Sequence, residues 1–325
     1  MFSIAQIRTI LAEKESQILS GVVMPEHLYE PIRYILSLGG KKIRLALVLL
    51  SCNLFSDDLD AAVAPALGIE IFHNFTLMHD DLMDRSDMRR GNPTVHKKWN
   101  DNTAVLSGDA MLVLAYQYIS KCKPDILPNV LELFSTTAAE VCEGQQYDMD
   151  FETRSDVSEN EYLEMIRLKT AVLLGCALKS GAVIGNAGSE DARNLYDFGI
   201  NLGLAFQLKD DLLDVYGETS VFGKNIGGDI VCNKKTFLLI KALEKADIEQ
   251  RNKLQYWLSL PSFDKEEKIK QVTAIYNQLH IKSLCEEKIA FYYDHAIKCL
   301  NHVNVENERK QELMLLAGTL SERRV

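Results

Sequence analysis

Two segments of the chain share the aspartate spacing Asp-Asp-x-x-Asp. The aspartates are Asp80, Asp81 and Asp84 in LMHDDLMDR, and Asp210, Asp211 and Asp214 in FQLKDDLLDVYG. Each run ends a long apolar segment, and on a helix its first and last aspartates share a face, where like charges repel each other. Mg²⁺ binds in proteins through one or two carboxylates together with substrate phosphates. The two runs therefore predict a metal site that handles a phosphorylated substrate.

Two simpler interpretations of these runs have to be weighed. A single run is as typical of a solvated helix end as of a metal site, but two copies on apolar segments make that interpretation weaker. Calcium storage is less favoured, because the chain has no EF-hand loop pattern. We therefore keep the metal-site prediction for both runs.

Basic residues gather beside the first run, although the chain is acidic as a whole. SDMRRGNP supplies Arg89 and Arg90, and the GGKKIR loop supplies Lys41 and Arg44. Guanidinium groups clamp phosphate at two points, lysine adds a point charge, and glycine lets the backbone approach an anion. Each basic group taken alone is more typical of a solvated patch, so these residues support an anion site only in combination.

Composition limits the class of protein that positions these residues. The chain has 325 residues, of which 47% are hydrophobic and 25% charged, as in ordinary globular proteins. With 36 basic and 46 acidic residues, the formal charge is 36 − 46 = −10. Nucleic-acid binding needs an excess of basic residues, so we expect no nucleic-acid partner.

The lack of a recognisable targeting signal and the pattern of the cysteines predict a cytoplasmic protein. The longest apolar stretch, Leu45–Phe55, is shorter than the roughly 20 residues that a membrane span needs, so we expect a buried helix and no membrane span. The first residues lack the order of a signal peptide. The seven cysteines are odd in number and form no CxxC, which is typical of reduced thiols in a cytoplasm.

Helical periodicity covers nearly the whole sequence, and no strand signal persists. We expect helices over 4–19, 26–37, 43–55, 60–85, 101–122, 126–151, 158–186, 189–216, 233–246, 248–260, 264–280, 281–302 and 306–322. No linker or repeat divides the chain. These features predict a single all-α domain, a large helical bundle over residues 1–325, in place of the two domains suggested by length alone.

Six motifs together identify a family. In order, GGKKIR, HNFTLMHDDLMDRSDMRRG, EGQQYD, LKTA, AFQLKDDLLD and FGKNIGGD resemble the trans-type isoprenyl diphosphate synthases from about residue 25 to residue 240. The resemblance implies an all-α homodimer whose aspartate motifs face each other across a central cavity and hold three Mg²⁺ ions. It implies condensation of isopentenyl diphosphate with an allylic diphosphate, such as dimethylallyl, geranyl or farnesyl diphosphate.

The resemblance also implies roles for single residues. The metal-binding residues are Asp80 and Asp84 for two ions and Asp210 for the third, which Asp211 and Asp214 support. Asp81 and Asp214 also belong to the metal-binding set. Isopentenyl diphosphate is bound by Lys41, Arg44, His73 and Arg90. The allylic diphosphate is bound by Arg89, Lys169, Thr170, Gln207 and Lys224, with Lys234 a weaker candidate. The catalytic set is Asp80, Asp81, Asp84, Lys169, Thr170, Gln207, Asp210, Asp211 and Lys224.

Departures from the family pattern and the residues before the first motif bear on product length. Leu45 stands where the family often has proline, which should alter loop rigidity more than chemistry. Two residues separate the acidic ends of the first motif, which resembles the archaeal-type geranylgeranyl or the long-chain branch more than typical bacterial farnesyl synthases.

Phe75, with Phe72 and the small Thr76, resembles the floor of the tunnel into which the product grows. We expect a twenty-carbon product, then fifteen carbons, then longer chains. Ordinary core packing of both phenylalanines is the alternative.

Two other functions compete with the synthase. A class I terpene cyclase also ionises an allylic diphosphate, but its second motif is of the Asn/Asp-x-x-Ser/Thr-x-x-x-Glu type, whereas here it is DDLLD. A non-catalytic subunit of a hetero-oligomer would be expected to lose aspartates or arginines of the motifs, and all are present. The sequence therefore favours a catalytic prenyltransferase.

Overall fold

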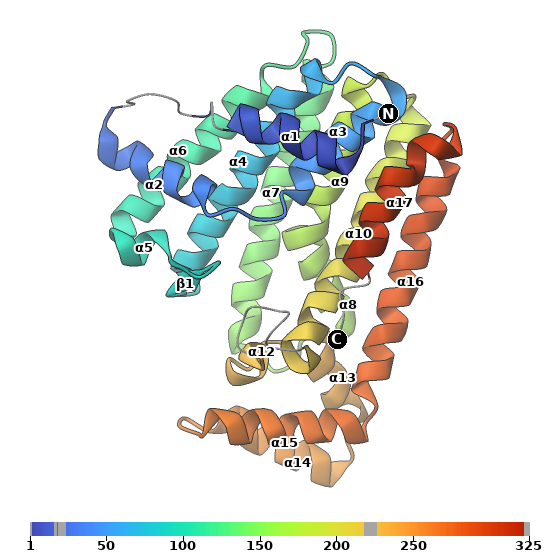
Figure 1. The fold of residues 1–325 in the computed structure, drawn as a ribbon. Helices are drawn as coiled ribbons and strands as arrows, with labels where there is room; N and C mark the ends of the chain where they lie inside the picture. Colours follow the sequence, from blue (N-terminus) through green and yellow to red (C-terminus); the bar gives the residue numbers. More distant parts are fainter. Residues whose placement is uncertain (1, 16–17, 19–23, 218–225, 322–325) are drawn as a thin grey trace. The chain divides into compact units, whose positions relative to one another are not determined.

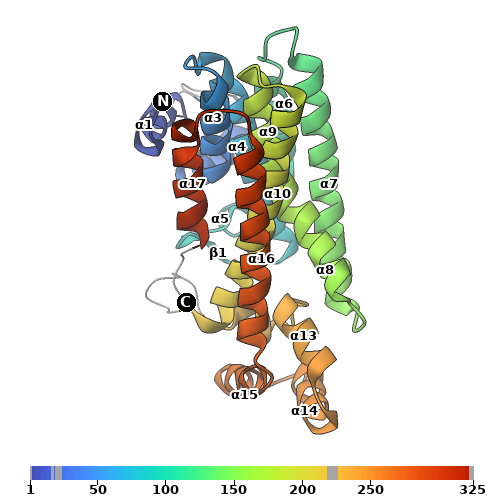
Figure 2. The same ribbon diagram turned by 90° about the vertical axis from the view of Figure 1, so that its right-hand side faces the viewer.

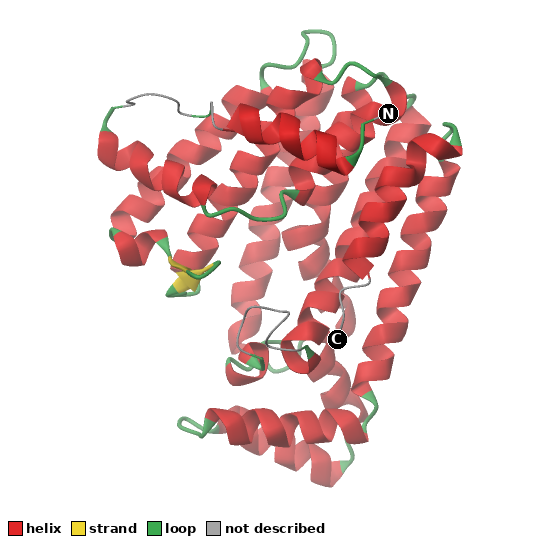
Figure 3. Cartoon of the chain, viewed as in Figure 1, coloured by secondary structure: helices red, strands yellow, loops and turns green. Residues whose placement is uncertain are grey.

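The computed structural model describes residues 2–15, 18, 24–217 and 226–321. Helices account for 79% of the chain and strands for almost none, which confirms the all-α prediction (Figure 3). Contacts between residues divide the chain into two compact units. The first comprises Met1–Thr137, Leu173–Tyr196 and His302–Leu313, and the second comprises Ala138–Val172, Asp197–Asn301 and Met314–Val325. The prediction of a single domain stays a prediction.

Two apolar helices form the centre of the first unit. Helix α3 (Ile43–Phe55) is buried continuously from Leu45 to Leu54, as the apolar stretch predicted. Helix α4 (Asp60–Met83) packs against α3 and α6. The other helices wholly within this unit are α1 (Ile4–Glu15), α2 (Glu26–Ser37), α5 (Val95–Lys98) and α6 (Asp101–Ile119) (Figure 1).

Helix α4 also bears on membrane association. Of the described helices it is the one long and apolar enough to cross a membrane, and 67% of its most apolar stretch is buried in the structure. Buried apolar helices form the cores of globular proteins, so the length and composition of α4 are weak evidence for a span.

A small hairpin follows α4 and corrects the expectation of a chain without strands. Strand β1 (Met88–Arg89) pairs antiparallel with β2 (Asn92–Pro93) across a turn of Arg90 and Gly91. The turn residues have φ of 53° and 75°, the left-handed pair that a tight two-residue hairpin requires. Strands of two residues are too short for an alternating pattern, so periodicity could not reveal them.

The second unit contains α8 (Glu159–Ile166), which begins at a reciprocal cap between Ser158 and Glu161. Its other helices are α12 (Gly228–Val231), α13 (Phe237–Lys245), α14 (Ile248–Ser259) and α15 (Lys265–Gln278). Figure 2 shows α13 leading into α14, with α15 beside them. Both units receive residues from α7 (Leu127–Thr153), α9 (Val172–Ile184), α10 (Ser189–Tyr216), α16 (Ile281–His302) and α17 (Asn307–Ser321).

The predicted bounds of α2, α3, α10 and α16 are those observed, and most other helices differ by one to three residues at an end, whereas two predicted helices depart further and the short α5 and α12 were not predicted. The predicted helix 158–186 is divided by a π-helical turn, η1 (Arg167–Ala171), between α8 and α9. The predicted helix 233–246 begins only at Phe237, because Asn233 adopts a left-handed φ of 57°. Both differences arise from packing against other helices, described below, which helical periodicity does not report.

Candidate active site

The first aspartate motif lies at the C-terminal end of α4 in the first unit. Asp80 and Asp81 are in the last turn of the helix, and Asp84 follows as its C-cap. Three carboxylates at the negative end of a helix dipole repel each other and the dipole, so they need nearby positive charge. Asp81 is only 4% exposed, whereas Asp84 is exposed to solvent.

Arg89 of the hairpin partly neutralises this motif. Its Nε donates to Asp81 Oδ2 at 2.7 Å, and its terminal nitrogen lies 3.7 Å from Asp80 Oδ2. Burial raises the pKa of Asp81, and Arg89 opposes that rise. The other oxygen, Asp81 Oδ1, is buried without a hydrogen-bond partner among the described residues. The motif therefore retains negative charge that suits a cation, and Asp80 and Asp84 are the carboxylates that can reach one.

The glycine loop and the hairpin turn fit together closely. Arg90 donates a hydrogen bond to the backbone carbonyl of Gly39. A Cβ atom on Gly40 would lie 2.8 Å from Arg90 Cζ, and the φ of Gly40 is +130°. Gly40 is therefore required both for its backbone conformation and for the space that the Arg90 guanidinium occupies.

His73 of α4 lies in this basic group as a neutral imidazole. Arg44 of α3 donates from Nη1 to His73 Nε2 at 3.1 Å. Burial, followed by the charges of Arg44, Arg90 and Arg89, holds the pKa of His73 well below its ordinary value. His73 therefore accepts from Arg44 and keeps its own proton on Nδ1. The structure thus brings Arg44, His73, Arg89 and Arg90 together, and places Lys41, exposed, on the adjoining loop.

The residues predicted to set product length also lie in the first unit. Phe72 and Phe75 are 1% and 8% exposed, with ring centroids 5.5 Å apart. Phe72 contacts Phe134, and Phe75 contacts His79. Thr76 donates its hydroxyl to the carbonyl of His73. Both phenylalanines belong to a packed aromatic cluster, so the alternative of ordinary core packing stays open.

In the second unit, the π-helical turn η1 carries Lys169 and Thr170. Two glycines press against its backbone: a Cβ on Gly144 of α7 would lie 2.3 Å from Lys169 N, and one on Gly203 of α10 would lie 2.6 Å from Ala171 Cα. A wider turn at this point fits only because both neighbouring helices present no side chain. Single π-helical turns are frequent at functional sites.

Polar contacts tie η1 to the second aspartate motif. Thr170 donates to Gln207 Oε1 at 3.1 Å, and Gln207 donates in turn to Asp211 Oδ1 at 2.9 Å. Tyr162 donates to Asp211 Oδ2 at 2.5 Å. Both oxygens of the buried Asp211 thus accept protein hydrogen bonds. This arrangement suits Asp211 to supporting its neighbours more than to binding a metal.

Burial also changes the ionisation of Asp211. The loss of solvation, followed by the charge of Asp229, raises its pKa to about 7, whereas Lys234 and the hydrogen bonds from Tyr162 and Gln207 oppose the rise. Asp210, the preceding residue, is only half-buried. Asp210 is therefore the more accessible carboxylate of the pair.

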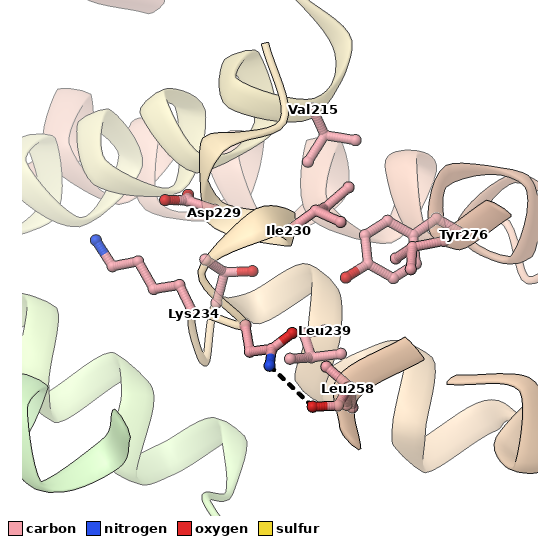
Figure 4. A pocket seen from close by; sticks show the side chains of 10 residues that line it. Val215, Asp229, Ile230, Lys234, Leu239, Leu258 and Tyr276 are labelled. Carbon is pink, nitrogen blue, oxygen red and sulfur yellow. Dashed lines mark hydrogen bonds between the residues drawn. The ribbon is translucent and has the colours of Figure 1, made fainter. Parts of the chain in front are cut away.

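Asp214 organises the start of α12. Its Oδ2 accepts from the backbone N–H of Asp229 at 2.9 Å, and its carbonyl accepts from Gly227 N. Figure 4 shows the side chains of Asp229 and Lys234 on one side of this segment, with apolar residues such as Ile230 on the other. The structure thus gives Asp214 a capping contact, and its predicted role as a metal ligand stays a prediction.

Sequence reasoning missed three residues of this unit. Lys169 Nζ lies 2.6 Å from Asp148 Oδ2, and Lys234 and Lys169 together lower the pKa of Asp148 against the effect of burial. Asp148 and Asp229 belong to the quoted motifs EGQQYD and FGKNIGGD, so their signal was present. Tyr162 had none. Lys224 lies outside the described residues.

Metal binding by these residues depends on donors from outside the protein. Within the described ranges, no group of three or more His, Cys, Asp or Glu side chains is arranged to hold a metal ion. One or two carboxylates together with substrate phosphates form a typical Mg²⁺ site. The paired carboxylates of the first motif fit that donor set.

Comparison with known proteins shows the family of this chain. A family model for polyprenyl synthetase matches residues 25–276. The chain belongs to the polyprenyl synthetase family. It is 43% identical over 226 residues to a geranylgeranyl diphosphate synthase of Methanosarcina mazei, covering 69% of this chain and 70% of the relative. It is 38% identical over 267 residues to a geranylfarnesyl diphosphate synthase of Natronomonas pharaonis, covering 76% and 78%.

A solved structure extends the similarity over the full length of the chain. The crystal structure of a geranylgeranyl pyrophosphate synthase matches with a TM-score of 0.95 and 42% identity, and each chain covers 100% of the other. Family, relatives and structure agree on the class of reaction. The protein is an enzyme, a trans-prenyltransferase, as its motifs predicted.

Proposed function

We propose that the enzyme condenses isopentenyl diphosphate with an allylic diphosphate to give geranylgeranyl diphosphate. The observation that carries this proposal is the first aspartate motif, where Asp80 and Asp84 adjoin the guanidinium group of Arg89, with Arg90 beside it in the hairpin. Carboxylates there suit divalent cations, and the guanidinium groups suit diphosphates. A site that combines both can bind and release diphosphate esters. The similarity to geranylgeranyl diphosphate synthases supports the named product.

The proposed metal is Mg²⁺, with three ions per active site. Polyprenyl synthetases are metal-dependent enzymes. We assign two ions to Asp80 and Asp84 and one to Asp210, and Mg²⁺ bound there would neutralise charge on the departing diphosphate. Asp81 is engaged with Arg89, and Asp214 caps α12, so their contacts support positioning roles.

The proposed reaction breaks the allylic carbon–oxygen bond, forms a carbon–carbon bond and releases a proton. We assign Arg89 and Lys169 to the departing diphosphate, whose negative charge their positive charges would stabilise as a preorganised electrostatic contribution. The isopentenyl double bond attacks the allylic cation, and the resulting cation loses a proton to the released diphosphate. Arg44, Arg90 and the neutral His73 are assigned to isopentenyl diphosphate. Apolar walls would keep water from quenching the cation.

The decisive experiment uses the purified chain alone. We expect it to release diphosphate from isopentenyl diphosphate plus dimethylallyl, geranyl or farnesyl diphosphate in the presence of Mg²⁺. Release from the allylic diphosphate without isopentenyl diphosphate, with a cyclic product, would indicate a terpene cyclase. No release from the chain alone, restored by a second protein, would indicate a non-catalytic subunit.

Product length is tested at Phe75. The proposal assigns Phe75 to the floor of the product tunnel, supported by its position five residues before Asp80 and by its slight exposure of 8%. Phe75→Ala should extend the products by one or more five-carbon units, measured by chromatography after incubation with labelled isopentenyl diphosphate. A twenty-carbon distribution unchanged in an active, folded variant would leave Phe75 as core packing. A parent product of twenty-five carbons would favour the activity of the geranylfarnesyl relative.

The proposed assembly is a homodimer in the cytoplasm, without a membrane span. Exposed apolar residues on α6 support the dimer: Leu106 and Val113, 60% and 58% exposed, share one face, and Val105, 44% exposed, lies beside them. Leu106→Asp with Val113→Asp should shift sedimentation from dimer to monomer. Ile248→Asp, at an exposed position of α14, is the matched control and should leave the dimer intact. A monomeric parent would contradict the proposed assembly.

A further inference from the structure

A lysine in α15 is completely buried. Lys268 has 0% exposure, which is rare for lysine because removing an ammonium group from water is costly. Burial lowers its pKa from the ordinary value. None of the diphosphate-binding motifs contains it. Its burial therefore needs an explanation from its contacts.

Its hydrogen bonds go to the end of α12 and to the turn that follows it. Lys268 Nζ donates to Asn233 Oδ1 at 2.6 Å and to the carbonyl of Val231, the last residue of α12, at 3.2 Å. The ring of Phe263 lies 4.0 Å from the ammonium and adds a cation–π contact. The ammonium group thus binds two neutral acceptors, the side-chain amide oxygen of Asn233 and a backbone carbonyl at the end of a four-residue helix.

Asn233 transmits this contact to the residue that follows it. It adopts a left-handed φ of 57°, and its Nδ2 donates to the carbonyl of Leu258 at 3.0 Å, the bond drawn in Figure 4. Its side chain is therefore held between α15 and the end of α14. The next residue, Lys234, donates its backbone N–H to the carbonyl of Asp229 at 2.9 Å. The direction of the Lys234 side chain depends on this turn.

Lys234 lies within the proposed diphosphate site. Its charge acts on Asp148, the partner of Lys169, and lowers the pKa of that carboxyl. Figure 4 shows its amino group on the same side of the segment as the carboxylate of Asp229. A rotation of the Asn233 turn would move the charge of Lys234 away from the carboxylates of Asp148 and Asp229.

We propose that Lys268 is a positioning residue, which fixes the Asn233 turn so that Lys234 presents its ammonium group to the allylic diphosphate. The inference rests on the proposed function and adds a residue to it. Lys268 lies outside every motif that sequence reasoning singled out and does not itself belong to the binding groups. It acts through Asn233 and Lys234.

The test compares Lys268→Met with Lys270→Met, a change on the same helix at a side chain that is 76% exposed. We expect Lys268→Met to raise KM for the allylic diphosphate about tenfold, with KM for isopentenyl diphosphate changed less than twofold. Lys270→Met should change neither. In a Lys234→Ala background, Lys268→Met should raise the allylic KM less than twofold, because the residue on which it acts is gone.

A second variant keeps the test valid if Lys268→Met does not fold. Asn233→Gly removes the acceptor side chain, and glycine adopts a φ of 57° without strain. It should raise the allylic KM as Lys268→Met does. An unchanged KM in both variants, or the same tenfold effect in the Lys234→Ala background, would overturn the proposal.

Binding of inorganic diphosphate with Mg²⁺, measured by calorimetry, separates this inference from the proposed function. A parent without prenyl transfer would contradict the function alone. Weaker diphosphate binding by Lys268→Met than by Lys270→Met would still support the positioning role. Equal binding by the two variants would contradict it, whatever the activity of the parent.

Discussion

Replacing Gly144 by alanine tests whether the π-helical turn is held in place by the glycine of α7. The new Cβ would lie 2.3 Å from Lys169 N and 2.7 Å from Leu168 C, both backbone atoms that cannot rotate away. An ordinary contact begins near 3.4 Å, so η1 must move by 3.4 − 2.3 = 1.1 Å or α7 must shift. Overpacking of this kind costs about 1–3 kcal/mol, offset by about 1 kcal/mol from the better helix propensity of alanine.

The displacement should reach the chemistry through Lys169 and Thr170. A misplacement of about 1 Å lowers catalysis by roughly a hundredfold. We therefore expect Gly144→Ala to lose up to about 2 kcal/mol of unfolding free energy and roughly a hundredfold in kcat/KM for the allylic diphosphate. Urea unfolding and steady-state kinetics measure the two effects.

Gly318→Ala in α17 is the matched control. The nearest heavy atom to its new Cβ is Tyr293 Oη at 4.0 Å, so alanine fits without a clash. This variant should gain about 0.5–1 kcal/mol of stability and keep parental kinetics. If Gly144→Ala were as stable as Gly318→Ala and kept kcat/KM within threefold of the parent, the close approach of α7 would not position η1.

Three further outcomes are expected. Asp80→Ala should abolish turnover with little loss of folding, because it removes a metal ligand and relieves repulsion; activity within tenfold of the parent at saturating Mg²⁺ would refute the assignment. Arg89→Ala should raise KM for the allylic diphosphate, and it should cost about 3 kcal/mol in urea unfolding because it leaves Asp81 buried and unpaired. Arg90→Ala should raise mainly KM for isopentenyl diphosphate. Equal effects of the two variants on both substrates would contradict the assignment of one arginine to each substrate. The pKa of Asp211 in the folded state, about 7, lies above its ordinary value of 3.8, so the folded protein binds the carboxyl proton more tightly than the unfolded chain does. The stability that the protonated Asp211 contributes in acid is therefore lost as pH rises from about 4 to 7. Asp211→Asn does not titrate, so its unfolding free energy in chelator should fall less over that range, and an unchanged slope would show that Asp211 ionises normally.

Much of the fold could be predicted because its signals are local. The bounds of α2, α3, α10 and α16 agree with those expected from helical periodicity, since an apolar face and its ends are written in consecutive residues. The two aspartate motifs were recognisable for the same reason: closely spaced carboxylates on an apolar helix are unfavourable without a cation. The sequence by itself thus determined the helical class, the family and the aspartates and basic groups of the candidate site.

Tertiary structure decided what each of these residues contacts. The π-helical turn depends on Gly144 and Gly203, which are far from it in sequence and whose missing side chains provide the space. Asp81 and Asp211 are the middle aspartates of identical spacings, yet one holds Arg89 and the other accepts from Tyr162 and Gln207. Periodicity and spacing give residues a common face but no partner. Burial and the approach of distant side chains set both the partner and the pKa, and these exist only once the chain has folded.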